Sequence, residues 1–190
     1  MEEKFDQFCD YVDALELTGN ENILIVGAGS LYSSYALSGL ANSVVAYEIN
    51  DKMYEKADEK ADTLYAIDET FDNVHLVQGD GLMDEEVYDR VVVFAGAPEI
   101  DYIDDARFGS LDKKDLGNDV VKRLRSMTVR NGIFFVPIGG YAYKFQKNDD
   151  EVEFTRLVDR SSMWAPLVGD YGHCRDDIVT AAENHDWDLF

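Results

Sequence analysis

The chain is poor in cations, cysteine and proline. Its 190 residues include 17 Lys and Arg against 39 Asp and Glu, which gives a formal net charge of −22. This charge excludes nucleic-acid backbones and anionic membranes as expected partners, because both are polyanions. The two cysteines, Cys9 and Cys174, form no C-x-x-C pair, and the acidic start is not typical of a secretory signal. We therefore expect a reduced, cytoplasmic setting, with a Cys9–Cys174 disulfide left open by the sequence.

Long apolar runs and clustered metal ligands are also absent from the sequence. No run approaches 18 apolar residues, so no membrane helix is expected. The histidines, His75, His173 and His185, lack ligand spacing, so no metal site is expected. The 46% hydrophobic and 12% aromatic content predicts a globular chain, with a single domain over residues 1–190.

The acids are mostly aspartate, with 25 Asp and 14 Glu. Aspartate-rich surfaces with few cations resemble those of proteins from a salt-saturated cytoplasm. We hold adaptation to high salt as a hypothesis, beside ordinary acidity, since concentrated salt would screen the self-repulsion.

A strand, a glycine turn, a helix and a second strand are predicted within residues 22–49. The apolar run Ile23–Val26 breaks into Gly27-Ala28-Gly29, and a second run, Val44–Tyr47, stops at Glu48. An acid about 20 residues beyond such a turn is typical of ribose binding. Tyr32 stands where a dinucleotide motif has its third glycine, and no P-loop occurs, so a pyrophosphate site is disfavoured. A glycine turn that binds nothing is the alternative.

Two further predicted strands end in small or acidic residues. Val74–Val77 ends in Gly79-Asp80-Gly81, and Val91–Phe94 ends at Ala95. Ligands of open α/β sheets bind beyond the carboxyl ends of the strands, so Glu48 and Asp80 are expected in one crevice. Glu48 could accept hydrogen bonds from both ribose hydroxyls, and Asp80 could accept one from an adenine amino group. The alternative for either acid is a helix cap or a turn.

The rest of the chain completes an alternating α/β pattern. Apolar spacing predicts helices over Lys4–Leu17, Asp51–Asp68, Lys113–Met127 and Asp176–His185, with Asn131-Gly132 ending the third. Predicted strands are Ile133–Ile138 and an edge hairpin of Tyr141–Lys147 and Val152–Val158.

Six segments, in this order, resemble the protein-L-isoaspartate O-methyltransferase family: GAGSLYSSYAL, VVAYEIN, VQGDG, YDRVVVFAGAPEI, NGIFFVPIGG and WAPLVG. The resemblance implies a doubly wound, Rossmann-like class I methyltransferase fold, with a mostly parallel seven-stranded sheet and a C-terminal antiparallel hairpin. It also implies S-adenosylmethionine as cofactor, with Gly27 and Gly29 at the methionine moiety, Glu48 at the ribose and Asp80 at adenine. The expected cofactor-binding residues are Gly27, Ala28, Gly29, Glu48, Ile49, Gly79, Asp80, Gly81 and Ala95.

The chain departs from the family pattern at both ends of the cofactor motif. Ile25 stands where the family has an acid, and Leu31 stands where it has a third glycine. An S-x-P-H-like motif that helps to hold the substrate would fall near Glu3 and Phe5 and is not there. We therefore expect weak or absent methylation of isoaspartyl peptides by this chain alone, even if it binds the cofactor. The long segment 101–119 is interpreted either as a solvated acidic loop or as a lid or partner surface that uses Tyr102, Phe108 and Leu111. The patch of Trp164 and Tyr171 is interpreted either as edge packing or, by the resemblance, as lying near the peptide site.

Two functions remain open on the sequence. The first is methyl transfer from S-adenosylmethionine to a carboxylate on a peptide or small molecule. A carboxylate is already ionised at neutral pH, so no general base and no catalytic triad are expected. The second is a catalytically degenerate protein of the same fold that acts as a binding or regulatory partner.

Overall fold

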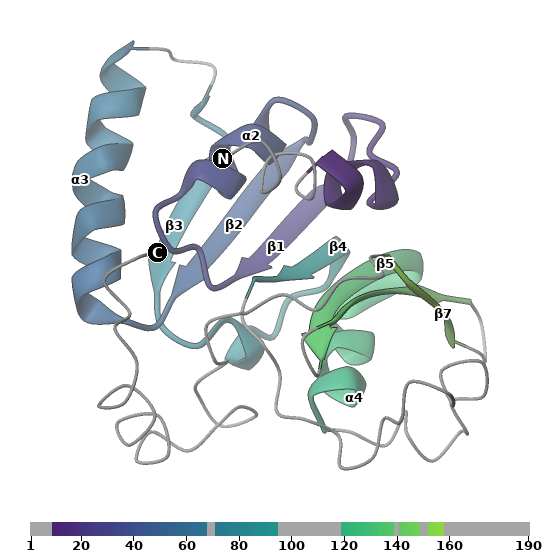
Figure 1. Cartoon of the computed structure of the whole chain (residues 1–190). Helices are drawn as coiled ribbons and strands as arrows, with labels where there is room; N and C mark the ends of the chain where they lie inside the picture. Colours follow the sequence, from purple (N-terminus) through teal and green to yellow (C-terminus); the bar gives the residue numbers. More distant parts are fainter. Residues whose placement is uncertain (1–8, 68–70, 95–118, 139–140, 149–151, 158–190) are drawn as a thin grey trace.

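The computed structural model describes residues 9–67, 71–94, 119–138, 141–148 and 152–157 (Figure 1). The strands are β1 (Asn22–Val26), β2 (Ser43–Glu48), β3 (Val74–Gln78), β4 (Tyr88–Val93), β5 (Thr128–Ile138), β6 (Tyr141–Lys147) and β7 (Val152–Arg156). The helices are α2 (Tyr32–Ser38), α3 (Asp51–Ile67), α4 (Asp119–Met127) and the 3₁₀ turn η2 (Gly81–Met83), and residues 9–14 are also helical.

The strands form one seven-stranded sheet in the order β3-β2-β1-β4-β5-β6-β7. The pairs from β3 through β5 are parallel, and β6 runs antiparallel to both β5 and β7. This confirms the predicted, mostly parallel sheet with an antiparallel hairpin after it. The chain order reverses between β1 and β4, and in doubly wound sheets such a reversal marks the ligand edge.

Each face of the sheet carries its own apolar core, because successive side chains of a strand point to opposite faces. In β1, Ile23 and Ile25 join the core that includes α2 and α3, whereas Leu24 and Val26 join the core that includes α4. All four are almost fully buried. The helices therefore cover both faces, as the doubly wound prediction requires.

The start of β5 corrects one prediction from the sequence. Asn131-Gly132 was expected to end a helix, but α4 ends at Met127 and β5 already begins at Thr128. The register against β4 jumps from Tyr88↔Thr128 to Arg90↔Ile133, so extra residues of β5 form a bulge. Asn131 lies in this bulge with φ 61°, a conformation that asparagine tolerates better than most residues. Asn-Gly thus bends a strand here.

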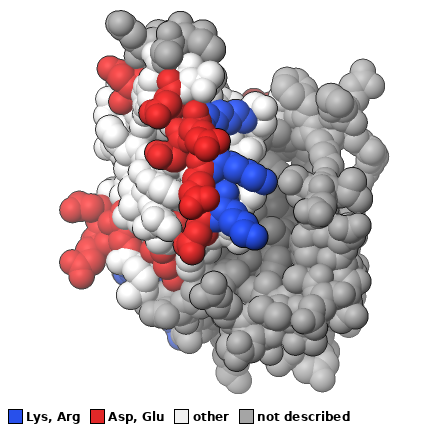
Figure 2. All heavy atoms as spheres, turned by 90° about the vertical axis from the view of Figure 1, so that its left-hand side faces the viewer, with Lys and Arg blue, Asp and Glu red and all other residues white. Residues whose placement is uncertain are grey.

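The outer surface of α3 is strongly charged. Figure 2 faces this side of the molecule and shows a line of acidic side chains with basic side chains beside it. Lys52, Lys56 and Lys60 are spaced four residues apart and so share one side of the helix. The acids of α3 are Asp51, Glu55, Asp58, Glu59 and Asp62.

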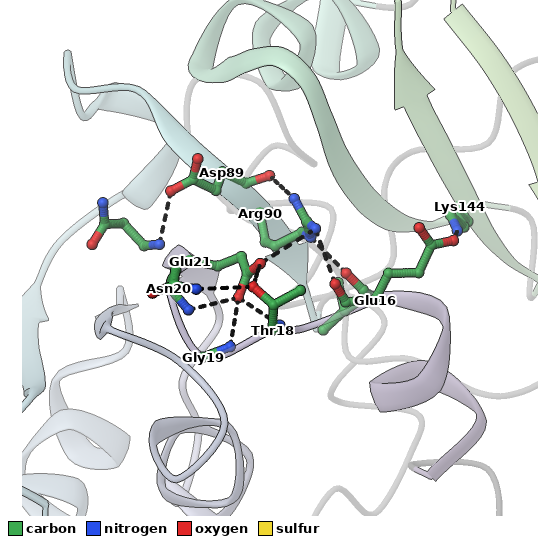
Figure 3. A network of polar contacts seen from close by, with 10 residues as sticks. Glu16, Thr18, Gly19, Asn20, Glu21, Asp89, Arg90 and Lys144 are labelled. Atoms are coloured by element: carbon green, nitrogen blue, oxygen red, sulfur yellow. Dashed lines mark hydrogen bonds and ion pairs between the residues drawn. The ribbon is translucent and has the colours of Figure 1, made fainter.

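A polar network holds the amino edge of the sheet together (Figure 3). Glu21 is 7% exposed, and its carboxylate accepts hydrogen bonds from the backbone N–H groups of Thr18, Gly19 and Asn20 and from the Thr18 hydroxyl. Arg90 of β4 donates to the carbonyls of Leu15 and Glu16 and lies 3.8 Å from Glu21. These bonds fasten the N-terminal helix to β1 and β4. The helix gives way to a turn at residues 15–16, before the predicted end at Leu17.

Several predictions fall outside the described residues. They concern Ala95, Cys174, the segment 101–118, the patch of Trp164 and Tyr171, and the terminal helix Asp176–His185. The single domain over residues 1–190 likewise stays a prediction. Cys9 is exposed with a free thiol. Within the described segments, no helix is long and apolar enough to cross a membrane, and no group of potential metal ligands occurs.

Candidate functional site

The glycine turn follows β1 and depends on left-handed backbone conformations. Gly27 has φ 85° and Gly29 has φ 54°, backbone angles that residues with a Cβ rarely adopt. The N–H groups of Gly27 and Ala28 both donate to the carbonyl of Tyr47, each at 2.9 Å. The end of β2 therefore fixes the first half of the turn.

Glu48, the last residue of β2, fixes the second half. Its Oε2 accepts a hydrogen bond from Gly29 N–H at 2.8 Å, and its Oε1 accepts one from Asn50 N–H at 2.9 Å. The side chain is 7% exposed. Each carboxylate oxygen has two lone pairs, so these two backbone bonds are compatible with further donors such as ribose hydroxyls. The turn role that the sequence left as an alternative is thus present in the structure.

The two departures from the family pattern belong to one buried cluster. Ile25 and Leu31 are both 0% exposed and lie in the core on the α2 face. Leu31 is the N-cap of α2 and has φ 64°, so the backbone keeps a glycine-like conformation without a glycine. Apolar side chains therefore pack at both positions where the resemblance implies an acid and a glycine, while Glu48 holds the turn from the neighbouring strand.

Asp80 lies beyond the carboxyl end of β3, next to the end of β2. Gly79, with φ 145°, donates its N–H to the carbonyl of Glu48 at 3.0 Å, which joins the two strand ends. Asp80 is the N-cap of η2, and its Oδ1 accepts from Leu82 N–H at 2.9 Å. The structure brings Glu48 and Asp80 to the same edge of the sheet, and their sharing of one ligand crevice stays a prediction.

The space beside the turns favours a close ligand approach. A Cβ added to Gly29 or Gly79 would meet no atom within 4 Å, so both glycines border open space. Gly81 differs, because an added Cβ would come within 2.8 Å of Tyr47 Cβ and 3.1 Å of Val26 Cγ2. Gly81 therefore serves packing between η2 and the sheet.

Two side chains next to the turns are exposed. Ile49, directly after Glu48, is 39% exposed. Tyr32 begins α2, is 71% exposed, and its ring centroid lies 2.9 Å from Lys60 Nζ of α3. An outward ring explains how a tyrosine fits where dinucleotide motifs have a glycine.

A second group of polar residues, which the sequence did not predict, surrounds Asp84, the residue directly after η2. Asp84 Oδ2 accepts hydrogen bonds from the hydroxyls of Tyr47 and Tyr88, at 3.1 and 2.6 Å. Burial opposes ionisation of Asp84, but hydrogen bonds from Tyr88, the Glu86 N–H and Tyr47, with Arg123 nearby, hold its pKa below the ordinary range. Burial, followed by the contact with Asp84, raises the pKa of Tyr88. Only the fold joins these residues, because they come from different elements and share no motif.

The carboxyl edge thus presents glycines beside open space and carboxylates from two adjacent strand ends. Carboxylates accept hydrogen bonds from hydroxyl and amino groups, and their negative charge disfavours a phosphate beside them. The arrangement fits a nucleoside that carries a ribose and an amino-substituted base. This is the chemistry expected for the nucleoside part of S-adenosylmethionine.

Sequence comparison identifies related proteins over most of the chain. Residues 5–104 match the family described as protein-L-isoaspartate(D-aspartate) O-methyltransferase. A protein-L-isoaspartate O-methyltransferase of Dictyoglomus thermophilum is 29% identical over 167 residues, which are 84% of this chain and 64% of the relative. Another, from Rhodopseudomonas palustris, is 36% identical over 170 residues, which are 85% of this chain and 58% of the relative. The chain thus spans about three fifths of the length of these curated relatives.

Structure comparison supports the same fold. A solved protein-L-isoaspartate O-methyltransferase matches with a TM-score of 0.65 at 20% identity, covering 87% of this chain and 48% of the other. A second such protein, from Plasmodium falciparum and in complex with S-adenosyl-L-homocysteine, matches with a TM-score of 0.58 at 16% identity, covering 83% and 69%. At these identities the matches establish the methyltransferase fold.

Proposed function

Because this chain belongs to the protein-L-isoaspartate(D-aspartate) O-methyltransferase family, we propose that it binds S-adenosylmethionine and transfers a methyl group to a carboxylate. The observation that supports this most directly is the meeting of Glu48, Asp80 and the glycine turn at one edge of the sheet. The relatives are named for isoaspartate, so an isoaspartyl carboxylate of a peptide is the proposed acceptor.

The residues of the chain have binding and orienting roles in this proposal. Gly27 and Gly29 let the backbone approach the methionine end, and Glu48 accepts from the ribose while it holds Gly29 N–H. Asp80 accepts from the adenine amino group, with Gly79 and Gly81 shaping its turn, and Ala28, Ile49 and Ala95 complete the proposed cofactor site. When bound, the cofactor supplies a methyl group on a sulfonium, which an ionised carboxylate can attack without a general base. The protein therefore contributes chiefly through positioning.

Calorimetry with S-adenosylhomocysteine and S-adenosylmethionine, in dilute and in high-salt buffer, tests the binding. We expect Asp80→Ala to weaken binding by about 1–3 kcal/mol, because a buried amino group of the ligand would lose its acceptor. The matched control is Asp72→Ala, which changes an exposed acid just before β3. Equal affinities of the wild type and Asp80→Ala would count against the adenine role.

A catalytically degenerate binding protein is the second candidate. Ile25 and Leu31 favour it, because both replace residues next to the methionine end with buried apolar side chains. Methyl release from an isoaspartyl peptide, and from free small carboxylates, separates the candidates. Cofactor binding without turnover on any of these substrates would support the degenerate protein, and turnover would support the enzyme.

A further inference from the structure

Tyr47 contacts both turns of the proposed cofactor site. Its carbonyl accepts from the N–H groups of Gly27 and Ala28, and its side chain lies so close to Gly81 that a Cβ there would come within 2.8 Å. Its hydroxyl donates to Asp84 Oδ2. One residue of β2 thus joins the glycine turn, the start of η2 and the acid that follows η2.

Asp84 and Arg123 connect η2 and the residue after it to β4 and α4. Asp84 Oδ2 also accepts from Tyr88 of β4, and Asp84 Oδ1 accepts from Glu86 N–H at 3.0 Å. Arg123 of α4 donates to the carbonyls of Leu82 and Asp84. Strands β2 and β4 and helix α4 therefore fix both the backbone and the side chain of this segment.

These contacts bear on Asp80 because its carboxylate caps η2 through Leu82 N–H. The turn η2 has three residues, and a single helical turn does not hold its own conformation in water. The position of the Asp80 carboxylate therefore depends on the contacts that η2 makes with its neighbours.

We propose that Tyr47, Asp84, Tyr88 and Arg123 form a positioning cluster that sets the Asp80 carboxylate relative to the glycine turn and so determines selectivity for an adenine base. The proposal rests on the proposed cofactor site. The four residues position Asp80 and take no part in the chemistry, and none of them was predicted as a site residue from the sequence.

Hydrogen–deuterium exchange of the free protein tests the positioning without any ligand. In Asp84→Ala we expect faster exchange, by about tenfold or more, in residues 27–29 and 79–83, because the acceptor of both hydroxyls is lost. Asp84→Asn keeps one carbonyl oxygen that can accept from both hydroxyls but loses the bond from Glu86 N–H, so it should restore part of the protection. Tyr88→Phe removes a single hydroxyl and provides a milder variant should Asp84→Ala fail to fold.

Ligand selectivity gives the second readout. We expect the wild type to bind S-adenosylhomocysteine about tenfold or more tightly than S-inosylhomocysteine, since the inosyl base presents a carbonyl to Asp80 in place of an amino group. Asp84→Ala or Tyr88→Phe should bring this ratio of affinities toward one. The matched control is Glu21→Gln, which alters a hydrogen-bonded carboxylate at the opposite edge of the sheet and should lower stability while the ratio stays unchanged.

The outcomes separate this proposal from the proposed function. Unchanged exchange together with an unchanged ratio in Asp84→Ala would overturn the positioning cluster, as would equal changes in Glu21→Gln. Faster local exchange in Asp84→Ala, in a protein whose wild type binds neither ligand, would support the positioning of η2 and would overturn both the proposed cofactor site and the adenine selectivity that rests on it.

Discussion

Leu31 combines two features that seldom occur together in one residue. Its backbone is left-handed, which costs a residue with a Cβ about 1–2 kcal/mol, and its side chain is fully buried. Burial of a leucine side chain stabilises by about 2–5 kcal/mol relative to alanine, so packing exceeds the strain. This balance explains how the turn tolerates leucine at a position with a left-handed backbone, where the resemblance implies a glycine.

The order of two Leu31 variants tests this balance. Leu31→Gly loses the packing but relieves the strain, so we expect a net loss of about 1–3 kcal/mol. Leu31→Ala loses the packing and keeps the strain, so it should be the less stable variant. In helices an alanine variant is normally more stable than a glycine variant, so the order expected here is reversed. Urea unfolding of both variants measures it. A less stable glycine variant would show that Leu31 carries no strain.

Glu21 gives stability a dependence on pH. Burial opposes its ionisation, but the hydrogen bonds from Thr18 and neighbouring N–H groups, with Arg90, lower its pKa from 4.5 to about 2. Because the pKa is lower in the folded state, the ionised carboxylate stabilises the protein fully at pH values above the pKa of the unfolded chain. This contribution is lost as pH falls from about 4.5 toward 2.

We therefore expect Glu21→Gln to unfold more readily at neutral pH, by about 1–3 kcal/mol, and to lose less stability than the wild type on acidification. Urea midpoints measured from about pH 6 to pH 3 give both slopes. Parallel slopes for the variant and the wild type would show that other carboxylates cause the acid sensitivity.

At the scale of elements, the bulge in β5 decides how the second half of the sheet joins the first. Gly132 lies where a Cβ would come within 2.6 Å of Thr128 Cγ2 and 2.8 Å of the Asp89 carbonyl. Both neighbours are held, since Thr128 is buried and its hydroxyl donates to the Leu124 carbonyl. The bulge therefore requires glycine at this position.

Gly132→Ala is expected to destabilise the protein by about 1–3 kcal/mol, because the neighbours of the new methyl group cannot move apart freely. Gly39→Ala is the matched control. Gly39 has φ −68°, and an added Cβ meets no atom within 4 Å, so this variant should be neutral or slightly stabilising. Thermal unfolding of the pair measures the difference, and equal effects would contradict the steric account.

At the scale of the whole molecule, the net charge of −22 opposes folding through self-repulsion. The Debye length falls from about 10 Å at 0.1 M salt to about 3 Å at 1 M, so concentrated salt removes most of this repulsion. On the high-salt hypothesis, we expect the melting temperature to rise by several degrees between dilute and molar potassium chloride. A variant with the five acids of α3 changed to their amides should show a smaller rise. A flat or falling curve for the wild type would leave ordinary acidity as the explanation.

The sequence by itself determined the sheet and the place of the candidate site. Apolar runs and glycine turns predicted five of the seven strands to within two residues of their observed bounds and placed Glu48 and Asp80 at neighbouring strand ends, whereas β4 and β5 begin earlier than predicted, at Tyr88 and Thr128. These features are local, because hydrophobic period and turn residues depend on a few consecutive residues.

Only the tertiary structure decided how those residues are held. The bulge at Asn131 depends on pairing with β4, and Asn-Gly alone is equally typical of a helix end. The joint burial of Ile25 and Leu31, and the meeting of Tyr47, Tyr88 and Asp84, bring together residues from separate elements. Such contacts depend on how separate elements pack, as for Tyr47 and Asp84, which lie 37 residues apart, and no hydrophobic period or turn motif records that packing.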